Sequence, residues 1–460
     1  MKYRALKPLA LAIALGHLSV ALPVHADEAE LRARVDKLTA ELEALKADMK
    51  AMHSQTKAIE AQQEAIASQQ EAAKSATPVT AQSSQGGAEK GVAVDRAVQQ
   101  VAAAVSQATL WGYGEINYNR PRNDGSQTQM DLRRAVFGIG YRFNENTRLM
   151  TEFEVEHAVA SADDSGEMEV EQFYIDHKLS DMANLKAGLF LIPAGLLNES
   201  HEPTHYYGVE RNFVETAIIP STWREGGAAV YGSTEFGLAW DVGLTTGPDL
   251  GKWDAASDEG RESPLGSIHQ ELQLANAHDL STYVALNYRG VPGFTIGSTV
   301  FTGKIAQAGA SNPTVGDLAA NARLMLWDAH TRWTPGDFDL SAVYAKGTIS
   351  HTQDLNLSFV GNPTPVPKEF YGWYTQAAYK VWESGTYSLS PFVRYERFNT
   401  ASAYATMPAG LEVDTAPTAA VATYGFNFYL NPNVVIKADY QHFKEDSDRT
   451  RYDLGLGVAF

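Results

Sequence analysis

The feature that most constrains this chain is a two-residue alternation of apolar and polar side chains, which runs from Thr109 to the last residue in segments of about ten residues. Successive side chains of a β-strand point to opposite faces, so each segment has one apolar face and one polar or small face. In the last segment, Tyr452, Leu454, Leu456, Val458 and Phe460 alternate with Asp453, Gly455, Gly457 and Ala459. The alternation predicts β-strands throughout this region.

Three further features distinguish a membrane barrel from a soluble sandwich, which would show the same alternation. The segments are long, and aromatic residues gather at their ends. Short turns, such as 142–146 and 430–433, alternate with long polar loops at 157–166, 247–268, 351–368 and 399–418. Hydrocarbon offers no hydrogen-bond partner, so every strand edge must pair. Residues 109–460 are therefore predicted to form an all-β transmembrane barrel of about 16 antiparallel strands.

The N-terminus has the pattern of a targeting segment. Lys2, Arg4 and Lys7 precede a short apolar stretch, Leu9–Leu22, and a small residue, Ala26, follows it. The pattern predicts a signal peptide over residues 1–26. The alternative is a membrane anchor, but the apolar stretch is shorter than the roughly 20 residues that span a bilayer.

Residues 27–74 carry a heptad repeat. Apolar residues recur with the 4-3 spacing of a coiled coil at Leu31, Val35, Leu38, Leu42, Leu45, Met49, Met52, Ile59 and Ile66. A coiled coil buries this seam only against other copies, so the repeat predicts an oligomer. The alternative is a single amphipathic helix packed on the barrel. Residues 75–108 have the composition of a linker, part of which could be helical.

The net negative charge of the chain lies entirely in the predicted barrel. Residues 1–108 hold 12 basic and 12 acidic side chains, which leaves 25 of the 37 basic and 43 of the 55 acidic residues in 109–460 and places the net charge of −18 there. Such a region repels a phosphate backbone, so no nucleic-acid partner is expected. The chain has no Cys, which excludes disulfides and thiolate metal sites.

Residues 109–460 resemble the phosphate-selective porin O and P family, in the branch that carries an N-terminal coiled coil. The resemblance lies in the segments 132–135, 185–193, 210–215, 219–227, 391–398 and 431–435. It implies a homotrimeric channel in the bacterial outer membrane with a periplasmic coiled coil. The last strand ends on an aromatic residue, Phe460, which resembles the signal read by the barrel-assembly machinery. The lipid bilayer and lipopolysaccharide are the other partners expected of an outer-membrane barrel. A full ladder of basic residues is not matched, and the acidic excess argues against phosphate selectivity.

The resemblance also implies that 193–224 folds partly into the lumen and narrows it. Arg211 and Arg224 would then present positive charge to a passing solute, and Glu210 and Glu215 would oppose or orient them. A constriction selects through its diameter and such charges. The alternative is that these charges pair with one another and hold the loop.

Strand parity places further arginines on the face that avoids lipid. These are Arg134, Arg142 and Arg148, together with Arg332, which shares a face with Asp328 and His330, and Arg394, which shares one with Glu396. An Arg near the bilayer midplane that faced lipid would cost about 2–4 kcal/mol, which favours inward placement. Either solute contact or bracing of acidic neighbours fits these positions.

Two clusters raise the question of metal binding. Asp163, Asp164, Glu167, Glu169 and Glu171 could hold a divalent cation or form a solvated loop. His201 and His205 have i, i+4 spacing, but Pro203 argues against a regular helix there. We therefore expect neither a metal nor a cofactor.

The prediction for function is passive diffusion of small hydrophilic solutes. The arginines favour anions, whereas the net charge favours cations. No G-x-S-x-G elbow, P-loop or dinucleotide fingerprint is present, so no enzymatic activity is expected. The alternative is an outer-membrane enzyme or an adhesive anchor with the coiled coil as its stalk.

Overall fold

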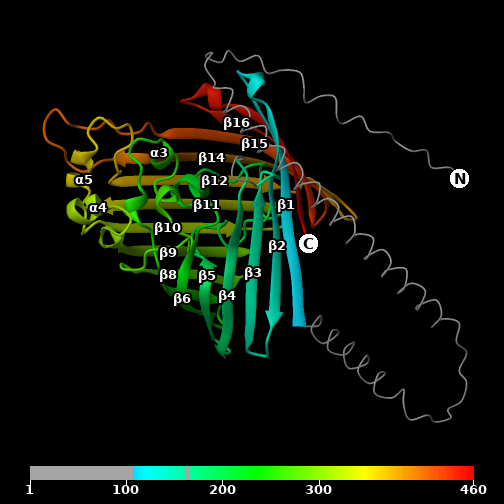
Figure 1. Ribbon diagram of the computed structural model, residues 1–460. Coiled ribbons are helices and arrows are strands. Elements are labelled where there is room, and N and C mark those ends of the chain that lie inside the picture. Colours follow the sequence, from blue (N-terminus) through cyan, green and yellow to red (C-terminus); the bar gives the residue numbers. More distant parts are fainter. Residues whose placement is uncertain (1–106, 161–164) are drawn as a thin grey trace, which may run out of the picture. The chain divides into compact units, whose positions relative to one another are not determined.

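The computed structural model describes residues 107–160 and 165–460 (Figure 1). The predicted signal peptide (1–26), the coiled coil (27–74) and the linker up to residue 106 lie outside the described residues. Asp163 and Asp164 also lie outside them. The described residues begin at the first strand of a large sheet.

All strands belong to one antiparallel sheet that closes on itself, because β1 pairs with both β2 and β17 and β9 pairs with β10. The strands are β1 (Ala108–Pro121), β2 (Gln129–Arg142), β3 (Thr147–Glu156), β4 (Met168–Ser180), β5 (Ala183–Leu191), β6 (Arg224–Ser233), β7 (Leu238–Thr245), β8 (Ser281–Val291), β9 (Phe294–Lys304), β10 (Arg323–Trp333), β11 (Phe338–Ser350), β12 (Glu369–Tyr379), β13 (Trp382–Ser384), β14 (Tyr387–Ala403), β15 (Ala419–Asn431), β16 (Val434–Phe443) and β17 (Arg451–Ala459). The short β13 continues the line of β12, and both pair with β14. The barrel therefore has sixteen transmembrane strands, which confirms the predicted fold class.

The two ends of the barrel differ. Short turns join the strands at one end, as at 143–146 and 432–433, and long connections such as 192–223 and 246–280 join them at the other. The long connections contain α3 (Glu259–Glu262), α4 (Pro313–Leu318), α5 (Gln353–Ser358), the π-helical turn η2 (Val214–Ile218) and the 3-10 turns η1 (Gly125–Gln127), η3 (Leu250–Lys252), η4 (Gly266–Ile268), η5 (Gln307–Gly309) and η6 (Ser447–Arg449). Among the described helices, none combines the length and apolar character that crossing a membrane requires.

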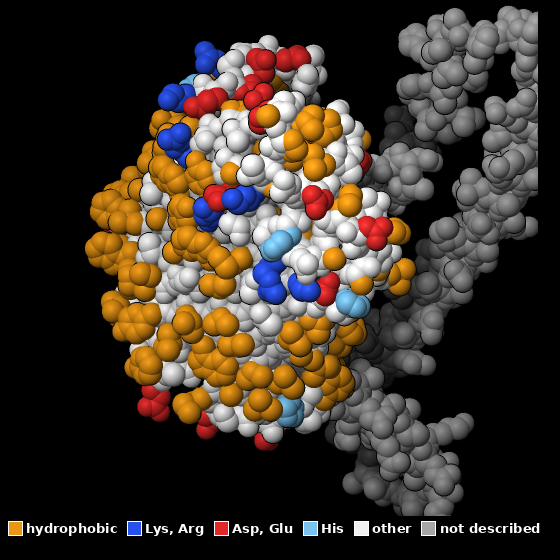
Figure 2. Space-filling model, turned by 90° about the vertical axis from the view of Figure 1, so that its left-hand side faces the viewer, with side chains coloured by type: hydrophobic (Ala, Val, Ile, Leu, Met, Phe, Trp, Pro, Cys, Tyr) orange, Lys and Arg blue, Asp and Glu red, His pale blue; other side chains and the backbone are white. Residues whose placement is uncertain are grey.

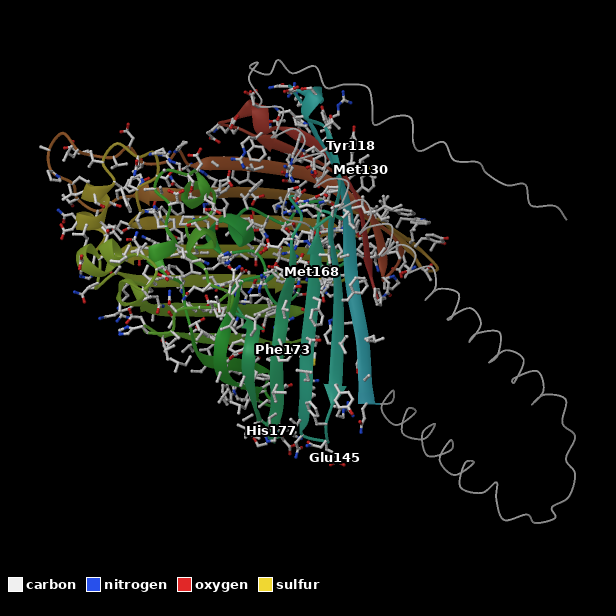
Figure 3. All side chains as sticks on the ribbon, viewed as in Figure 1. Tyr118, Met130, Glu145, Met168, Phe173 and His177 are labelled. Atoms are coloured by element: carbon white, nitrogen blue, oxygen red, sulfur yellow. The ribbon has the colours of Figure 1, made fainter. Side chains whose placement is uncertain are left out.

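Side chains alternate between the outside and the inside of the barrel as the sequence predicts. In β8, Val284 and Leu286 are 44% and 47% exposed, whereas Tyr283 and Ala285 are each 1% exposed. Figure 2 shows hydrophobic side chains spread over wide areas of one face, with charged side chains gathered toward its middle and top. Along β4, Phe173 lies between Met168 and His177, which is near the short turns (Figure 3). The outer surface therefore presents apolar side chains to the lipid.

The last strand closes the barrel. The backbone N–H of Phe460 donates to the carbonyl of Gly112 at 2.8 Å, and the N–H of Gly112 donates to the carbonyl of Phe460 at 3.0 Å. Leu454 points outward and is 54% exposed, whereas Asp453 points inward and is 1% exposed. Pairing with β1 leaves no free strand edge, which is what hydrocarbon requires.

Part of the interior is a packed apolar core rather than open water. Ile218, Ile219 and Trp223, from the connection after β5, are buried against inward-facing residues such as Phe301 and Phe370. The lumen of a sixteen-stranded barrel is too wide for the side chains of its strands to fill. Without further residues, water would occupy it. The long connection supplies the additional side chains.

Candidate functional site

The connection between β5 and β6, residues 192–223, folds into the lumen, and a buried carboxylate holds its first half. Glu215 accepts hydrogen bonds from the backbone N–H groups of Leu196 and Leu197 at 2.5 and 2.8 Å. Its other oxygen accepts from the Asn212 amide at 2.8 Å and from the Tyr374 hydroxyl of β12 at 3.0 Å. Glu215 therefore ties the connection to the barrel wall, and we call residues 192–223 the infolded loop.

The middle of the infolded loop is attached to other strands. The Tyr206 hydroxyl donates to Glu115 of β1 at 2.6 Å, and the backbone N–H of Val209 donates to Asp439 of β16 at 2.6 Å. The Asn427 amide of β15 donates to the Tyr206 carbonyl at 3.0 Å. The loop thus crosses the lumen between β12 and the β15–β16–β1 wall.

Arg134 lies on the inner face of β2 within a set of carboxylates. Its Nε is 2.8 Å from Glu115, its Nη1 is 2.9 Å from Glu154 and its Nη2 is 3.4 Å from Glu156. The side chain is buried, and three carboxylates surround one guanidinium. Arg134 braces the wall of β1, β2 and β3.

Three more of the predicted arginines also have carboxylate partners. Arg224 pairs with Glu169 and, at 2.8 Å, with Glu271. Arg332 pairs with Asp339 at 2.5 Å and Arg394 with Glu396 at 3.1 Å. These pairs favour the bracing interpretation.

The structure does not bring Arg142 to the infolded loop. It lies at the end of β2 beside a short turn, is exposed, and has no hydrogen bond to the loop among residues 107–160 and 165–460. Arg148, which pairs across the strands with Arg142, is 2.6 Å from Asp176. The alternation of side chains along the strands therefore predicts that Arg142 and Arg148 lie on the inner face. It does not predict how far they lie from the infolded loop.

Arg211 differs from the other arginines of the infolded loop region. Its Nη1 donates to the hydroxyls of Ser221 and Thr222 at 2.5 and 3.0 Å, and its Nη2 donates to the carbonyl of His201 at 3.2 Å. It has no carboxylate partner within the described part of the chain, and its Nε has no hydrogen-bond partner there. Glu210 beside it accepts from the Asn117 amide at 3.1 Å.

A cavity of about 400 Å³ lies between the infolded loop and the wall of β1 to β4. Its lining includes the carboxylates of Glu115, Glu154, Glu156, Glu167, Glu169, Glu210 and Glu271 and the guanidiniums of Arg133, Arg134, Arg211, Arg224 and Arg451. A second cavity of about 370 Å³ is lined by Pro193, Glu199, Asn287, Arg289 and His330, nearer the short turns. Both cavities have mixed charge, which suits small hydrophilic solutes of either sign.

His201 and His205 do not come together. His205 pairs with Glu202 at 2.9 Å and its side chain is 49% exposed, whereas the side chain of His201 is 5% exposed and lies 3.0 Å from Glu171. Burial lowers the pKa of His201, but the carboxylate of Glu171 outweighs burial and raises this pKa above the ordinary value. Glu152 completes a cluster with these two residues, which sequence reasoning missed.

One curated protein resembles the chain in sequence, and one solved porin structure shares its fold. An uncharacterized protein of Aquifex aeolicus is 29% identical over 377 residues, which cover 79% of this chain and 81% of that protein. The solved structure of OmpF of Salmonella typhi in complex with daunomycin has a TM-score of 0.53 at 14% identity, and the match covers 77% of this chain and 97% of OmpF. For the anion-selective porin of Comamonas acidovorans the TM-score is 0.48 at 11% identity, with 77% and 99% covered.

The family comparison covers most of the chain. Residues 105–454 match the family described as phosphate-selective porin O and P. The match spans the whole closed barrel and the infolded loop, except for the last residues of β17. The chain belongs to the phosphate-selective porin O and P family and forms a channel of the outer membrane.

Proposed function

We propose that the channel passes small hydrophilic solutes by passive diffusion, with a weak preference for anions, around the infolded loop. The observation that carries this preference is Arg211. It lines the cavity of about 400 Å³ and has no carboxylate partner within the described residues, whereas Arg134 and Arg224 have such partners. A fixed positive charge at a narrow point attracts anions and repels cations.

The acidic excess supports the opposite preference. The lining of the 400 Å³ cavity contains seven carboxylates and five guanidiniums. Measurement of the reversal potential in a KCl gradient across a planar bilayer decides between the two. A potential of the sign that chloride permeation produces supports the proposal. A potential of the opposite sign would leave the channel intact and remove the anion preference.

We do not extend phosphate selectivity to this chain. Phosphate recognition needs several donors that are not already engaged by carboxylates, and Arg134, Arg224, Arg332 and Arg394 all have carboxylate partners. Addition of phosphate at millimolar concentration should therefore leave the chloride current nearly unchanged. Strong block by phosphate would overturn this part of the proposal.

We further propose a homotrimer that is exported by the signal peptide 1–26 and is assembled with help from the aromatic C-terminus, Phe460. Residues 27–74 would form a periplasmic coiled coil among three copies. Deletion of residues 27–74 should leave conductance intact and weaken the oligomer, as measured by crosslinking and light scattering. Loss of conductance from a folded barrel would contradict that division of roles. We expect no enzymatic activity.

A further inference from the structure

Three side chains with metal-binding atoms meet where the infolded loop touches the wall. Glu152 comes from β3, Glu171 from β4 and His201 from the loop. One ligand atom of each lies within 4.8 Å of the other two. Their exposed fractions are 8%, 0% and 5%, so the cluster is shielded from bulk water. None of the three residues lines either cavity of the proposed solute path.

A β-bulge directs Glu171 toward this point. In the β3–β4 pair, Glu152 is opposite Gln172 and Phe153 is opposite Val170, so Glu171 is the additional residue between them. Val170 and Phe173 point outward and are 39% and 52% exposed, which leaves Glu171 and Gln172 both on the inner face. Bulges commonly re-aim a side chain at a functional position.

His201 presents an unshared electron pair to the cluster when its ring is neutral. Its Nδ1 is 2.9 Å from the carbonyl oxygen of Asn198, which can only accept a hydrogen bond. Nδ1 therefore carries the proton, and Nε2 is the free nitrogen. A carbonyl that fixes the ring in this way is the usual outer contact of a metal-binding histidine. The ring also packs edge-on against Tyr113, with centroids 5.5 Å apart.

The carboxylates are held in place by donors, and neither forms a salt bridge with Lys or Arg in the described structure. Glu152 accepts from the Trp111 indole at 2.6 Å and from the Gln172 amide. Glu171 Oε1 is 3.0 Å from His201 Nε2 and has no other polar partner in the described structure. Two buried carboxylates facing one imidazole are costly without a further positive charge.

We propose that His201 Nε2, Glu171 Oε1 and a Glu152 oxygen bind one divalent transition-metal ion of the Zn²⁺ type. Two ligands that are each about 2.1 Å from a metal lie at most about 4.2 Å apart, so the His201–Glu171 pair already fits and Glu152 needs to move by less than about 1 Å. One nitrogen and two carboxylate oxygens suit Zn²⁺ better than Mg²⁺ or Ca²⁺, which prefer all-oxygen sites.

Such an ion would join β3, β4 and the infolded loop at one point. Removing it would leave the barrel closed, because no strand pairing depends on it. The loop would lose one anchor near Asn198, while Glu215 and Tyr206 would still hold it. The expected consequence is a noisier open channel after chelation rather than an unfolded protein.

The test uses the full-length folded protein in detergent, treated with a chelator and then dialysed against Zn²⁺ in the presence of excess Mg²⁺. We expect one bound Zn²⁺ per chain at this site by elemental analysis, and a higher melting temperature with Zn²⁺ than without. His201→Gln and Glu171→Gln should each weaken Zn²⁺ binding by at least about 100-fold and abolish the rise in melting temperature. Binding should weaken at lower pH, because protons compete for Nε2.

The matched control is His205→Gln, which removes an exposed histidine four positions along the same loop and should bind Zn²⁺ as the wild type does. Should His201→Gln fail to fold, Cu²⁺ loaded into the wild type provides a second measurement, since its electron paramagnetic resonance spectrum reports coupling to a single imidazole nitrogen. Unchanged Zn²⁺ binding in folded His201→Gln would overturn the proposal. Absence of bound Zn²⁺ in the wild type, or a Cu²⁺ spectrum without nitrogen coupling, would do the same.

Discussion

Arg211 donates to the hydroxyl of Thr222 at 3.0 Å across the infolded loop. Its acceptors are hydroxyls and the carbonyl of His201 rather than carboxylates. The nearby Arg224 instead pairs with Glu271 at 2.8 Å. The two arginines therefore differ in their partners, although both carry one positive charge. Under the proposed function, Arg211 would favour anions, whereas Arg224 would hold the strands and the loop together.

Replacement of Arg211 by Ala should shift selectivity toward cations. The change removes the charge that no carboxylate compensates, and we expect the chloride-to-potassium permeability ratio to fall by about threefold. The reversal potential in a KCl gradient measures this ratio. Arg211→Lys keeps the charge and should stay near the wild-type value. An unchanged ratio in Arg211→Ala would remove Arg211 from the solute path.

Replacement of Glu271 by Gln should change the chloride-to-potassium permeability ratio in the opposite direction. Arg224 would keep Glu169 but lose one of its two carboxylates, so the lining would become more positive and the same ratio should rise by about twofold. Glu145→Gln is the matched control, because Glu145 lies in a short turn at the far end of the barrel (Figure 3). A fall in the ratio, or an equal rise in the control, would count against this electrostatic explanation.

Replacement of Glu215 by Ala should loosen the infolded loop without opening the barrel. The N–H groups of Leu196 and Leu197 would lose their acceptor, and each buried unpaired donor costs about 1–3 kcal/mol. Hydrogen exchange of residues 192–223 should therefore accelerate by at least about tenfold. Glu202→Gln, a change at a more exposed glutamate of the same loop, should not accelerate exchange. Equal exchange in Glu215→Ala and wild type would show that the loop is held elsewhere.

Replacement of Leu286 by Arg tests the orientation of the strands. Leu286 lies in the middle of β8 and faces outward, so Arg there should reduce the free energy of unfolding by about 2–4 kcal/mol in a bilayer. Thr282→Arg, on the same face near the strand end, should cost at most about 1 kcal/mol. Unfolding by denaturant in lipid vesicles measures both. Similar costs at the two positions would indicate that this face does not span the lipid.

Much of the barrel could be predicted from the sequence because the orientation of each side chain depends on its position within its own strand. Alternation along a strand decides which side chains face lipid, so Leu454 points outward and Arg134 points inward as parity predicts. Closure follows from the need to pair every edge in hydrocarbon. The last strand alternates as predicted. It ends with Phe460, whose backbone pairs with that of Gly112.

The candidate site was less predictable because its contacts are long-range. Arg224 pairs with Glu271 far along the chain, which no periodicity encodes. Glu169 was grouped with a predicted acidic loop, but it pairs with Arg224. Glu171 is directed inward by a bulge, and a bulge inverts the parity on which sequence reasoning depends. The cluster with His201 was therefore invisible before the register was known.

The apolar filling of the lumen was also not predicted. Ile218 and Trp223 lie in the connection after β5. The prediction for this segment depended only on its charged residues, which are Arg211, Arg224, Glu210 and Glu215, and not on its hydrophobic side chains. Sixteen strands indicate a wide lumen, but they do not indicate how much of it a loop occupies. Only the packing of these residues against Phe301 and Phe370 shows where the water-accessible space remains.

Single-channel recording of the purified, folded protein in a planar lipid bilayer tests the channel function most directly. We expect stepwise, ohmic current increments that scale with KCl concentration and fall when hydrophilic polymers small enough to enter the pore are added. Increments that occur in groups of three would also support the trimer. A folded barrel that inserts into the bilayer and passes no ions would contradict the function concluded here.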